Sequence, residues 1–299
     1  MNANLPSVTI AIPFYNAEST LLDAVRSVFA QTHQDWELIL IDDGSTDNSL
    51  DLARSIKDPR VRVYSDGLNR RLAARLNEVV SLASFDFIAR MDADDLMAKD
   101  RIEKELEVLV NYEECDLVST GVLSLTDDYQ PVGLRTVNSS HVVSPRSLLL
   151  CSHGIVHASI LARKSWFERN RYREALPFAE DYSLWISSYS KGDLRIRFLS
   201  EPMYFYREDS SASPQKLLKA YSVNRSIILQ DAKSNFSFLD KAFVYIRSLS
   251  QSLVIYLLDK FGGVGWVRGL RVKQELTVGD RSFYLHEIDE IKSFDLPLS

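Results

Sequence analysis

Short apolar runs alternate with amphipathic segments along the first half of the chain. Residues 7–13 (SVTIAIP) and 36–42 (WELILID) are predicted strands, and the second is continuously apolar over four positions, as in a strand buried on both faces. The residues between them place apolar side chains at helical spacing. Further strands are predicted at 61–65, 85–91 and 116–125, and helices at 45–56, 72–83 and 99–112. This alternation predicts an α/β fold with an open, mostly parallel sheet flanked by helices, whose ligands bind at the carboxyl ends of the strands.

The pattern is looser beyond about residue 130. A short helix is predicted at 144–152, a strand at 157–163, a helix at 179–192, two strands at 195–199 and 203–207, and a mainly helical tail at 217–273. We therefore expect one α/β domain over residues 1–215 and a mainly helical extension over residues 216–299.

Composition narrows the class of protein. The 299 residues are 45% hydrophobic and 25% charged, as in a globular protein, and the net charge of −6 argues against nucleic acid as a partner. Two cysteines, Cys115 and Cys151, suggest no disulfide framework. We see neither a signal-peptide pattern nor an apolar stretch long enough to span a bilayer, so we expect a cytoplasmic protein.

Two of the first four predicted strands end in clustered carboxylates. Asp92, Asp94 and Asp95 follow one strand, and at such close spacing each carboxylate makes ionisation of its neighbours less favourable. An Asp-x-Asp sequence there suits Mg²⁺ or Mn²⁺, although Asp94 or Asp95 can instead cap a helix that starts near Lys99 or Asp100. Because capping needs one carboxylate rather than three, the cluster favours a metal site.

The second cluster is Asp42-Asp43-Gly44, at the end of the strand 36–42. Gly44 permits a positive φ, and residues 45–47 can cap the helix that follows. Capping leaves Asp42 and Asp43 unexplained. A carboxylate at this edge can accept the N3–H of uracil or a ribose hydroxyl.

Taken in order, these segments resemble the inverting family 2 glycosyltransferases of GT-A fold, a Rossmann-like fold. The resemblance runs from about residue 7 to residue 207, through PFYNAESTLLDAVRSVFAQTHQDWELILIDDGSTDNS, ARMDADD and FAEDYSLW. It implies transfer from a UDP-sugar donor, with Mn²⁺ or Mg²⁺ as cofactor. The residues that it assigns to the nucleoside are Pro13, Tyr15, Asp42 and Asp43. It makes Asp94 the preferred direct metal ligand, whereas Asp92 contacts ribose or reaches the metal through water.

The resemblance also identifies a base. Asp181, in the Glu180-Asp181 pair, matches the family's catalytic residue, and an inverting displacement needs a base within about 3 Å of the attacking hydroxyl. The alternative for this pair is a helix N-terminus stabilised by acidic side chains. Between the two carboxylate motifs, Arg75 is expected to reach the donor, and Arg71 stands where glycine is frequent in the family.

Two further residues match the family pattern less specifically. His157 is expected either to line the acceptor or diphosphate side of the site or to pack in the core. Arg207, at the end of a predicted strand, can meet the diphosphate or form a salt bridge with Glu201 or Asp209. Both alternatives stay open at the level of sequence.

The tail combines an apolar face with basic residues. Apolar side chains recur at helical spacing, and six lysines and arginines accompany two acids: Asp240 and Asp259 against Lys241, Arg247, Lys260, Arg268, Arg271 and Lys273. Such a helix can pack on the catalytic domain or rest on an anionic membrane. We expect the acceptor to be a glycan or a lipid-linked oligosaccharide, as in O-antigen-type polysaccharide assembly. We also expect the protein to make peripheral contact with the inner face of the cell membrane.

Two other functions share some of these features. A nucleotidyltransferase also joins a nucleotide fold to metal-binding aspartates, but it typically has a basic, glycine-rich loop after the first strand, which residues 13–19 lack. A non-catalytic relative that binds nucleotide-sugars or glycans is disfavoured by the presence of both the metal motif and the Glu-Asp motif.

Overall fold

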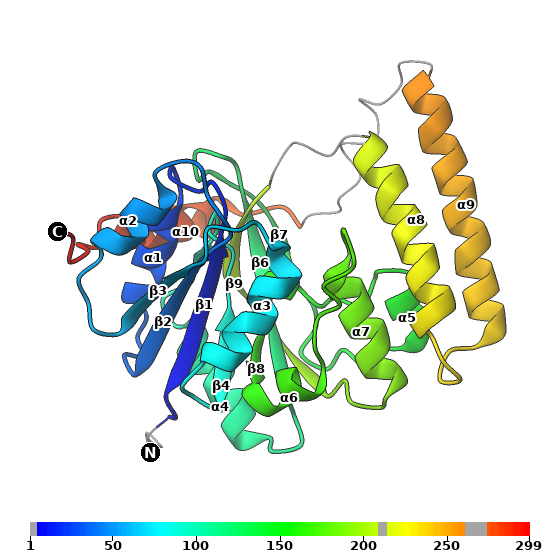
Figure 1. Ribbon diagram of the computed structural model, residues 1–299, viewed down its shortest axis with the longest axis horizontal. Coiled ribbons are helices and arrows are strands. Elements are labelled where there is room, and N and C mark those ends of the chain that lie inside the picture. The colour runs from blue at the N-terminus through cyan, green and yellow to red at the C-terminus, as the bar shows by residue number, and fades with distance from the viewer. Residues whose placement is uncertain (1–4, 209–213, 261–273) are drawn as a thin grey trace.

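A single mixed sheet forms the centre of the molecule (Figure 1). The computed structural model describes residues 5–208, 214–260 and 274–299, and within them the sheet has nine strands in the order β3-β2-β1-β4-β8-β6-β9-β5, with β7 paired to β6. The strands are β1 (Val8–Phe14), β2 (Trp36–Asp42), β3 (Val61–Ser65), β4 (Phe87–Arg90), β5 (Leu96–Met97), β6 (Leu117–Leu125), β7 (Pro131–Arg135), β8 (Leu161–Arg163) and β9 (Ile196–Arg207).

Helices lie on both faces of this sheet, as predicted. They are α1 (Leu21–Phe29), α2 (Ser49–Ser55), α3 (Arg71–Leu82), α4 (Arg101–Asn111), α5 (Pro145–Leu149), α6 (Lys164–Arg169), α7 (Glu180–Ser190), α8 (Pro214–Asp231), α9 (Phe238–Lys260) and α10 (Val278–Lys292), with a 3-10 turn η1 (His157–Ser159). Alternate residues of one strand enter different cores. Ile10 and Ile12 of β1 pack with α1 and α4, whereas Ala11 packs with α3. This two-sided burial explains the continuously apolar strands.

The four N-terminal strands are parallel, so their carboxyl ends meet at one edge. In the register of the sheet Phe14 pairs with Asp42, Asp42 pairs with Ser65, and Ala11 pairs with Arg90. The Asp42-Asp43 pair and the loop that begins at Met91 therefore leave the sheet on the same side, as the parallel arrangement predicted.

Two sequence predictions need correction in the second half. The strands expected at 195–199 and 203–207 are one strand, β9, which is irregular beside Gly121 of β6. A Cβ on Gly121 would lie 2.7 Å from the carbonyl oxygen of Ser200, so glycine permits this close approach. The strand expected at 157–163 begins only at Leu161, because residues 157–159 form η1.

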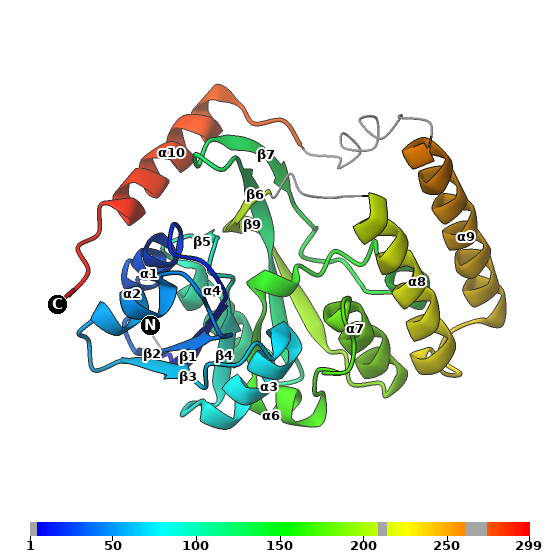
Figure 2. The same cartoon turned by 45° about the horizontal axis from the view of Figure 1, so that its top comes forward.

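The C-terminal extension separates into two parts. Helices α8 and α9 lie side by side against α7 and α5, whereas α10 packs on the opposite side of the molecule, against α1 and β7 (Figures 1 and 2). The last residues continue along the catalytic core: the amide of Ser299 donates to the carbonyl of Ser55 at 2.9 Å. Across the described ranges, no helix combines the length and the apolar character needed to cross a membrane.

Candidate active site

The Asp-rich loop after β4 is fixed to β9 through Asp95. Its carboxylate accepts hydrogen bonds from the hydroxyl of Tyr204 at 2.8 Å and from the backbone N–H of Arg207 at 2.7 Å. The same Tyr204 hydroxyl accepts from the N–H of Asp92 at 3.0 Å. Burial and the neighbouring carboxylates of Asp92 and Asp94 raise the pKa of Asp95 well above its usual range. Asp95 thus positions the loop, and the expectation that it caps α4 is wrong, since β5 intervenes and α4 starts after Asp100.

Asp92 and Asp94 remain closer to solvent than Asp95. A guanidinium nitrogen of Arg90 donates to Asp92 Oδ1 at 2.6 Å, and the Arg90 side chain is almost completely buried. Asp94 is exposed. Neighbouring protein atoms partly desolvate the Asp94 carboxylate, and this desolvation and the charge of Asp92 raise the pKa of Asp94. The charge on Asp92 thus makes ionisation of Asp94 less favourable.

The Glu180-Asp181 pair begins α7, directly after a left-handed residue. Ala179 has φ of +59°, a conformation in which the chain turns sharply into the helix. Burial raises the pKa of Asp181, Arg90 opposes this shift, and Asp92 adds to it. Because Arg90 and Asp92 both affect the pKa of Asp181, the two acidic motifs lie near each other, although they are some ninety positions apart in the sequence.

His157 lies behind Arg90, against aromatic side chains. Its Nε2 is 2.8 Å from the hydroxyl of Tyr172, and its ring packs edge-on against Trp185. Burial and the positive charge of Arg90 lower the pKa of His157 well below its usual value, so the imidazole is neutral at physiological pH. The His157 ring thus packs against aromatic side chains of the core and lies close enough to Arg90 for its charge to affect the pKa.

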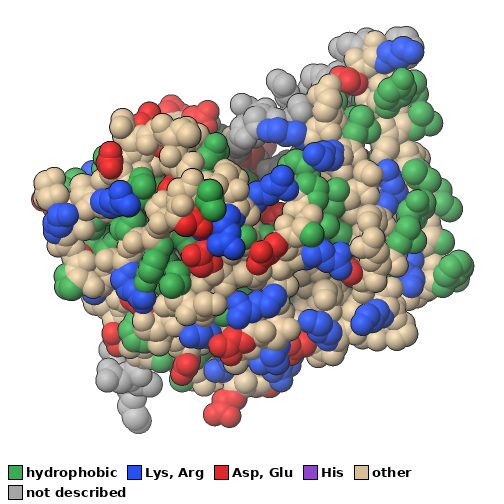
Figure 3. Space-filling view, viewed as in Figure 1, with side chains coloured by type: hydrophobic (Ala, Val, Ile, Leu, Met, Phe, Trp, Pro, Cys, Tyr) green, Lys and Arg blue, Asp and Glu red, His purple; other side chains and the backbone are tan. Residues whose placement is uncertain are grey.

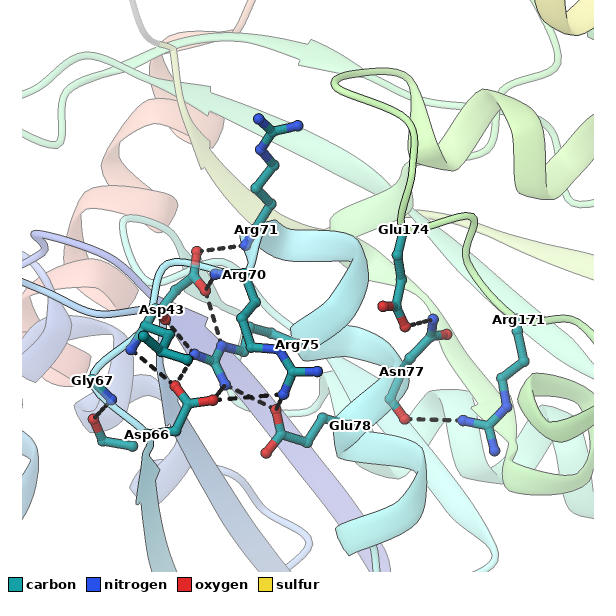
Figure 4. Close-up of polar contacts among 12 residues, drawn as sticks. Asp43, Asp66, Gly67, Arg70, Arg71, Arg75, Asn77, Glu78, Arg171 and Glu174 are labelled. Carbon is teal, nitrogen blue, oxygen red and sulfur yellow. Dashed lines mark hydrogen bonds and ion pairs between the residues drawn. The ribbon is translucent and has the colours of Figure 1, made fainter.

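The Asp42-Asp43 edge is held together by internal hydrogen bonds. Asp42 accepts from the N–H of Ser45 at 2.9 Å and from the hydroxyl of Ser65 at 2.8 Å. Asp43 accepts from the N–H groups of Arg70 and Arg71 and from Nε of Arg75 at 2.9 Å (Figure 4). Both aspartates therefore shape the loops at this edge.

Arg75 organises the same loops from within. Its side chain is 1% exposed, and its other nitrogens donate to Asp66, to Glu78 and to the carbonyl of Leu68 (Figure 4). Arg75 was expected to reach the donor. The structure instead places its guanidinium in this network of carboxylates, where Arg75 strongly lowers the pKa of Asp66.

Arg71 has a backbone conformation that favours glycine. Its φ is +69°, in the left-handed region, and its N–H donates to Asp43 at 3.0 Å. Figure 4 shows its side chain pointing away from the Asp43–Arg75 network. Gly44 has φ of +76°, as anticipated, and a Cβ there would lie 2.8 Å from the carbonyl carbon of Leu68. The two loops thus meet too closely for a side chain at residue 44.

The other predicted residues line the same edge. Pro13 is buried near the end of β1, and Tyr15, which follows the strand, is 50% exposed. Arg207 ends β9 with its guanidinium 5.1 Å from the centre of the Tyr129 ring and 3.8 Å from Asp127. The acidic partner of Arg207 is therefore Asp127 rather than Glu201, and Asp209 lies outside the described residues.

A pocket of about 400 Å³ opens between α3, α7 and α8. Its polar side chains are Arg71, Glu180 and Lys219, and it is lined further by Leu72, Ala73, Leu176, Pro177 and Phe178. Because Glu180 adjoins Asp181, this pocket gives solvent and ligands access to the start of α7.

Sequence reasoning missed three residues of the site. Arg90 places a charge in an otherwise apolar strand immediately before the carboxylates, and this position was a usable signal. Tyr172 and Tyr204 gave none, because their partners are 15 and about 110 positions away. Only the fold brings them to the site.

Comparisons with known proteins agree with this geometry. The sequence model described as "Glycosyl transferase family 2" matches residues 9–169. EpsE of Bacillus subtilis, named as a glycosyltransferase, is 32% identical over 247 residues, which cover 81% of this chain and 87% of EpsE. TuaG of the same organism, named as a teichuronic acid biosynthesis glycosyltransferase, is 33% identical over 42% of this chain and 51% of its own length.

Solved structures share the fold. Staphylococcus aureus TarS in complex with UDP aligns with a TM-score of 0.59 at 17% identity, over 81% of this chain and 70% of the TarS chain. The mannosyltransferase PcManGT from Pyrobaculum calidifontis, in complex with GDP-Man and Mn²⁺, aligns with a TM-score of 0.58 at 14% identity, over 96% of this chain and 87% of its own. The chain therefore belongs to glycosyl transferase family 2, and it is a glycosyltransferase with a GT-A-like sheet.

Proposed function

We propose that this enzyme transfers a sugar, with inversion, from a UDP-sugar to a hydroxyl of a glycan acceptor. The observation that supports it best is the convergence of two acidic motifs on Arg90, which donates to Asp92 and acts on the pKa of Asp181. One motif is suited to a leaving diphosphate and the other to an incoming hydroxyl. A single displacement needs these two functions on opposite sides of the anomeric carbon.

The donor is expected to lie across the carboxyl ends of β1, β2 and β4. The exposed ring of Tyr15 is available to the nucleoside, while Asp42 and Asp43 keep the surrounding loops in shape. That TarS was crystallised with UDP supports a uridine nucleotide as the first choice. Arg207, at the end of β9, is available to the diphosphate.

The residues present fit a divalent cation. Asp94 is exposed, with a pKa raised by its surroundings and by Asp92, so a cation would relieve the repulsion between the two carboxylates. Asp94 and Asp92 are the residues that would hold Mn²⁺ or Mg²⁺, which prefer carboxylate oxygens as ligands. When bound, the metal would offset the negative charge that grows on the leaving diphosphate.

Asp181 is the proposed base. The acceptor oxygen attacks the anomeric carbon as its proton passes to the Asp181 carboxylate, and the bond from that carbon to the diphosphate oxygen breaks, releasing UDP. Burial raises the pKa of Asp181 and makes its carboxylate a better proton acceptor, while the charge of Arg90 opposes this rise. His157, being neutral, orients Tyr172 beside this arginine.

The acceptor is proposed to be a lipid-linked oligosaccharide of a surface polysaccharide. The name of TuaG supports polysaccharide assembly as the setting, and the pocket between α3, α7 and α8 supports access of an extended acceptor to Glu180 and Asp181. The surface of α9, described below, is compatible with an acceptor presented at a membrane.

A donor screen tests this proposal. Purified protein with Mn²⁺ is incubated with a panel of UDP-, GDP- and dTDP-sugars, and hydrolysis or transfer is measured with and without chelator. We expect one UDP-sugar to be consumed and chelator to abolish the reaction. Consumption of only a GDP- or dTDP-sugar would contradict the donor, and undiminished activity in chelator would contradict the metal.

A further inference from the structure

Helix α9 turns its most apolar face away from the protein. Six large side chains on one side of the helix are between 43% and 76% exposed: Leu239, Phe243, Ile246, Leu249, Leu253 and Leu257. They follow one another at intervals of three or four residues, which places them on a single stripe. We call this set the α9 stripe. Helix α9 does pack on the rest of the chain, through the opposite face, where Val244 joins the core, and this packing leaves the stripe exposed.

The inward face of α9 is smaller and more polar. Its buried residues are Val244, Ser248 and Ile255. Arg225 of α8 donates from one guanidinium nitrogen to the hydroxyls of Ser248 and Ser252, each at 3.0 Å. A helix of a globular protein normally buries its apolar side and exposes its polar side. Most of the apolar surface of α9 is thus exposed within the described chain and is available to a partner.

Basic residues accompany the stripe. Residues 214–260 contain seven lysines and arginines and three aspartates, a net charge of +4 in a chain whose total is −6. Lys233, Arg247 and Lys260 are exposed. Figure 3 shows hydrophobic side chains along the outer edge of α9 with basic side chains beside them. Arg268, Arg271 and Lys273, which also belong to the expected basic tail, lie outside the described residues.

We propose that the α8–α9 hairpin docks on an anionic lipid surface, with the α9 stripe entering the interface and the basic residues meeting lipid phosphates. Large apolar side chains beside exposed lysine and arginine are the features of helices that lie in the membrane plane. A second copy of the chain fits less well, because two hairpins of charge +4 would face each other.

The docking surface lies on the acceptor side of the site. Helix α8 packs on α7, which begins with Glu180 and Asp181, and Lys219 of α8 lines the pocket that contains Glu180. Docking through α9 thus brings this pocket to within about two helix diameters, roughly 20 Å, of the lipid surface. A glycan attached to a membrane lipid is then held near the base. This inference concerns binding alone, so it stands or fails independently of the donor and metal assigned above.

Vesicle co-sedimentation of the full chain tests the proposal. We compare wild type with the stripe variant Ile246→Ser/Leu253→Ser/Leu257→Ser and with a control, Val110→Ser/Val132→Ser/Val278→Ser, which removes exposed apolar side chains from α4, β7 and α10. Vesicles are phosphatidylcholine alone or an equimolar mixture with phosphatidylglycerol. We expect wild type and control to bind the mixed vesicles, and the stripe variant to bind about tenfold or more weakly.

A charge variant separates the two parts of the interaction. Arg247→Glu/Lys260→Glu keeps the stripe and should reduce binding to the mixed vesicles, with little change on phosphatidylcholine alone. Equal binding of wild type and the stripe variant would overturn the proposal. So would a wild-type dimer in sedimentation velocity that the stripe variant converts to monomer without any vesicle binding, because the stripe would then be an interface between copies.

Discussion

Arg90 and Asp92 form an ion pair of 2.6 Å at the point where β4 becomes the Asp-rich loop. The Arg90 side chain is buried, and its Nε has no hydrogen-bond partner among the described residues. An arginine in this position offsets the negative charge of Asp92, Glu180 and Asp181 together. We infer that Arg90 couples the leaving-group side of the site to the base, although it is not one of the carboxylates of either motif.

Replacing Arg90 should therefore alter the pH dependence of transfer. In Arg90→Gln the positive charge that opposes the raised pKa of Asp181 is lost, so that pKa rises further. A base works only when deprotonated, and the acid limb of the kcat/KM profile should move to higher pH. At neutral pH we expect a loss of about tenfold or more.

The matched control for this change is Arg62→Gln, which also removes an arginine from an ion pair, here with Glu37 near the amino end of the neighbouring strands. Its pH profile should match that of wild type. If the acid limb of the Arg90→Gln profile stays in place, Arg90 has no influence on the base.

Asp94→Asn tests the proposed metal contact. Removing the exposed carboxylate should weaken the Mn²⁺ dependence of UDP binding by about tenfold or more, since a neutral amide oxygen is a poorer ligand for a hard cation. Isothermal titration calorimetry with UDP at a series of Mn²⁺ concentrations measures this directly. Asp86→Asn, an exposed position at the amino end of β4, is the control and should leave the titration unchanged. Equal Mn²⁺ dependence in wild type and Asp94→Asn would exclude Asp94 as a ligand.

Tyr204→Phe tests how the Asp-rich loop is held. The substitution removes one hydroxyl that donates to the buried Asp95 and accepts from the Asp92 N–H. Leaving these groups unpaired should lower the free energy of unfolding by about 1–3 kcal/mol in urea denaturation. Tyr112→Phe, at an exposed tyrosine on the same molecule, should change it by less than about 0.5 kcal/mol. A Tyr204→Phe protein as stable as wild type would show that the Tyr204 hydroxyl does not stabilise the loop.

Arg71→Gly should make the protein more stable. At φ of +69° an arginine is strained by about 1–2 kcal/mol, and glycine removes this strain at an entropic cost of about 0.5–1 kcal/mol. We expect a net gain on the order of 0.5–1 kcal/mol in urea denaturation. Arg70→Gly, one residue earlier with φ of −101°, removes no strain and should destabilise the protein. A loss of stability in both variants would contradict the strain argument.

The parallel half of the fold was predictable because its signal is local. Continuously apolar strands such as 36–42 and amphipathic helices between them fix the layers, and the parallel order then places Asp42 and Met91 at one edge. In the second half the strands are antiparallel or irregular. A two-residue strand such as β5, or the return of α10 to α1, depends on contacts distant in sequence. No periodicity reveals such contacts.

Site residues follow the same division. Motif aspartates could be identified by residue type and spacing, but their roles depend on partners elsewhere. Asp95 is assigned to positioning by the hydroxyl of Tyr204 and the N–H of Arg207, and the guanidinium of Arg75 is paired with Asp43, Asp66 and Glu78. Arg90 differs from these residues. Its unusual position, a charge within a buried strand, could be read from the sequence, but its role required the structure.

The proposal that Asp181 is the catalytic base is tested most directly by the variant Asp181→Asn, assayed for transfer and for UDP binding in the same preparation. The amide is close in size to the carboxylate, keeps an oxygen that can accept from the N–H of Tyr182, and cannot take a proton from the acceptor. Glu168→Gln, at an exposed position on α6, serves as the control. We expect the transfer activity of Asp181→Asn to fall by about 100-fold or more, while its Mn²⁺-dependent affinity for UDP stays within about twofold of wild type. Undiminished transfer by Asp181→Asn would contradict this proposal.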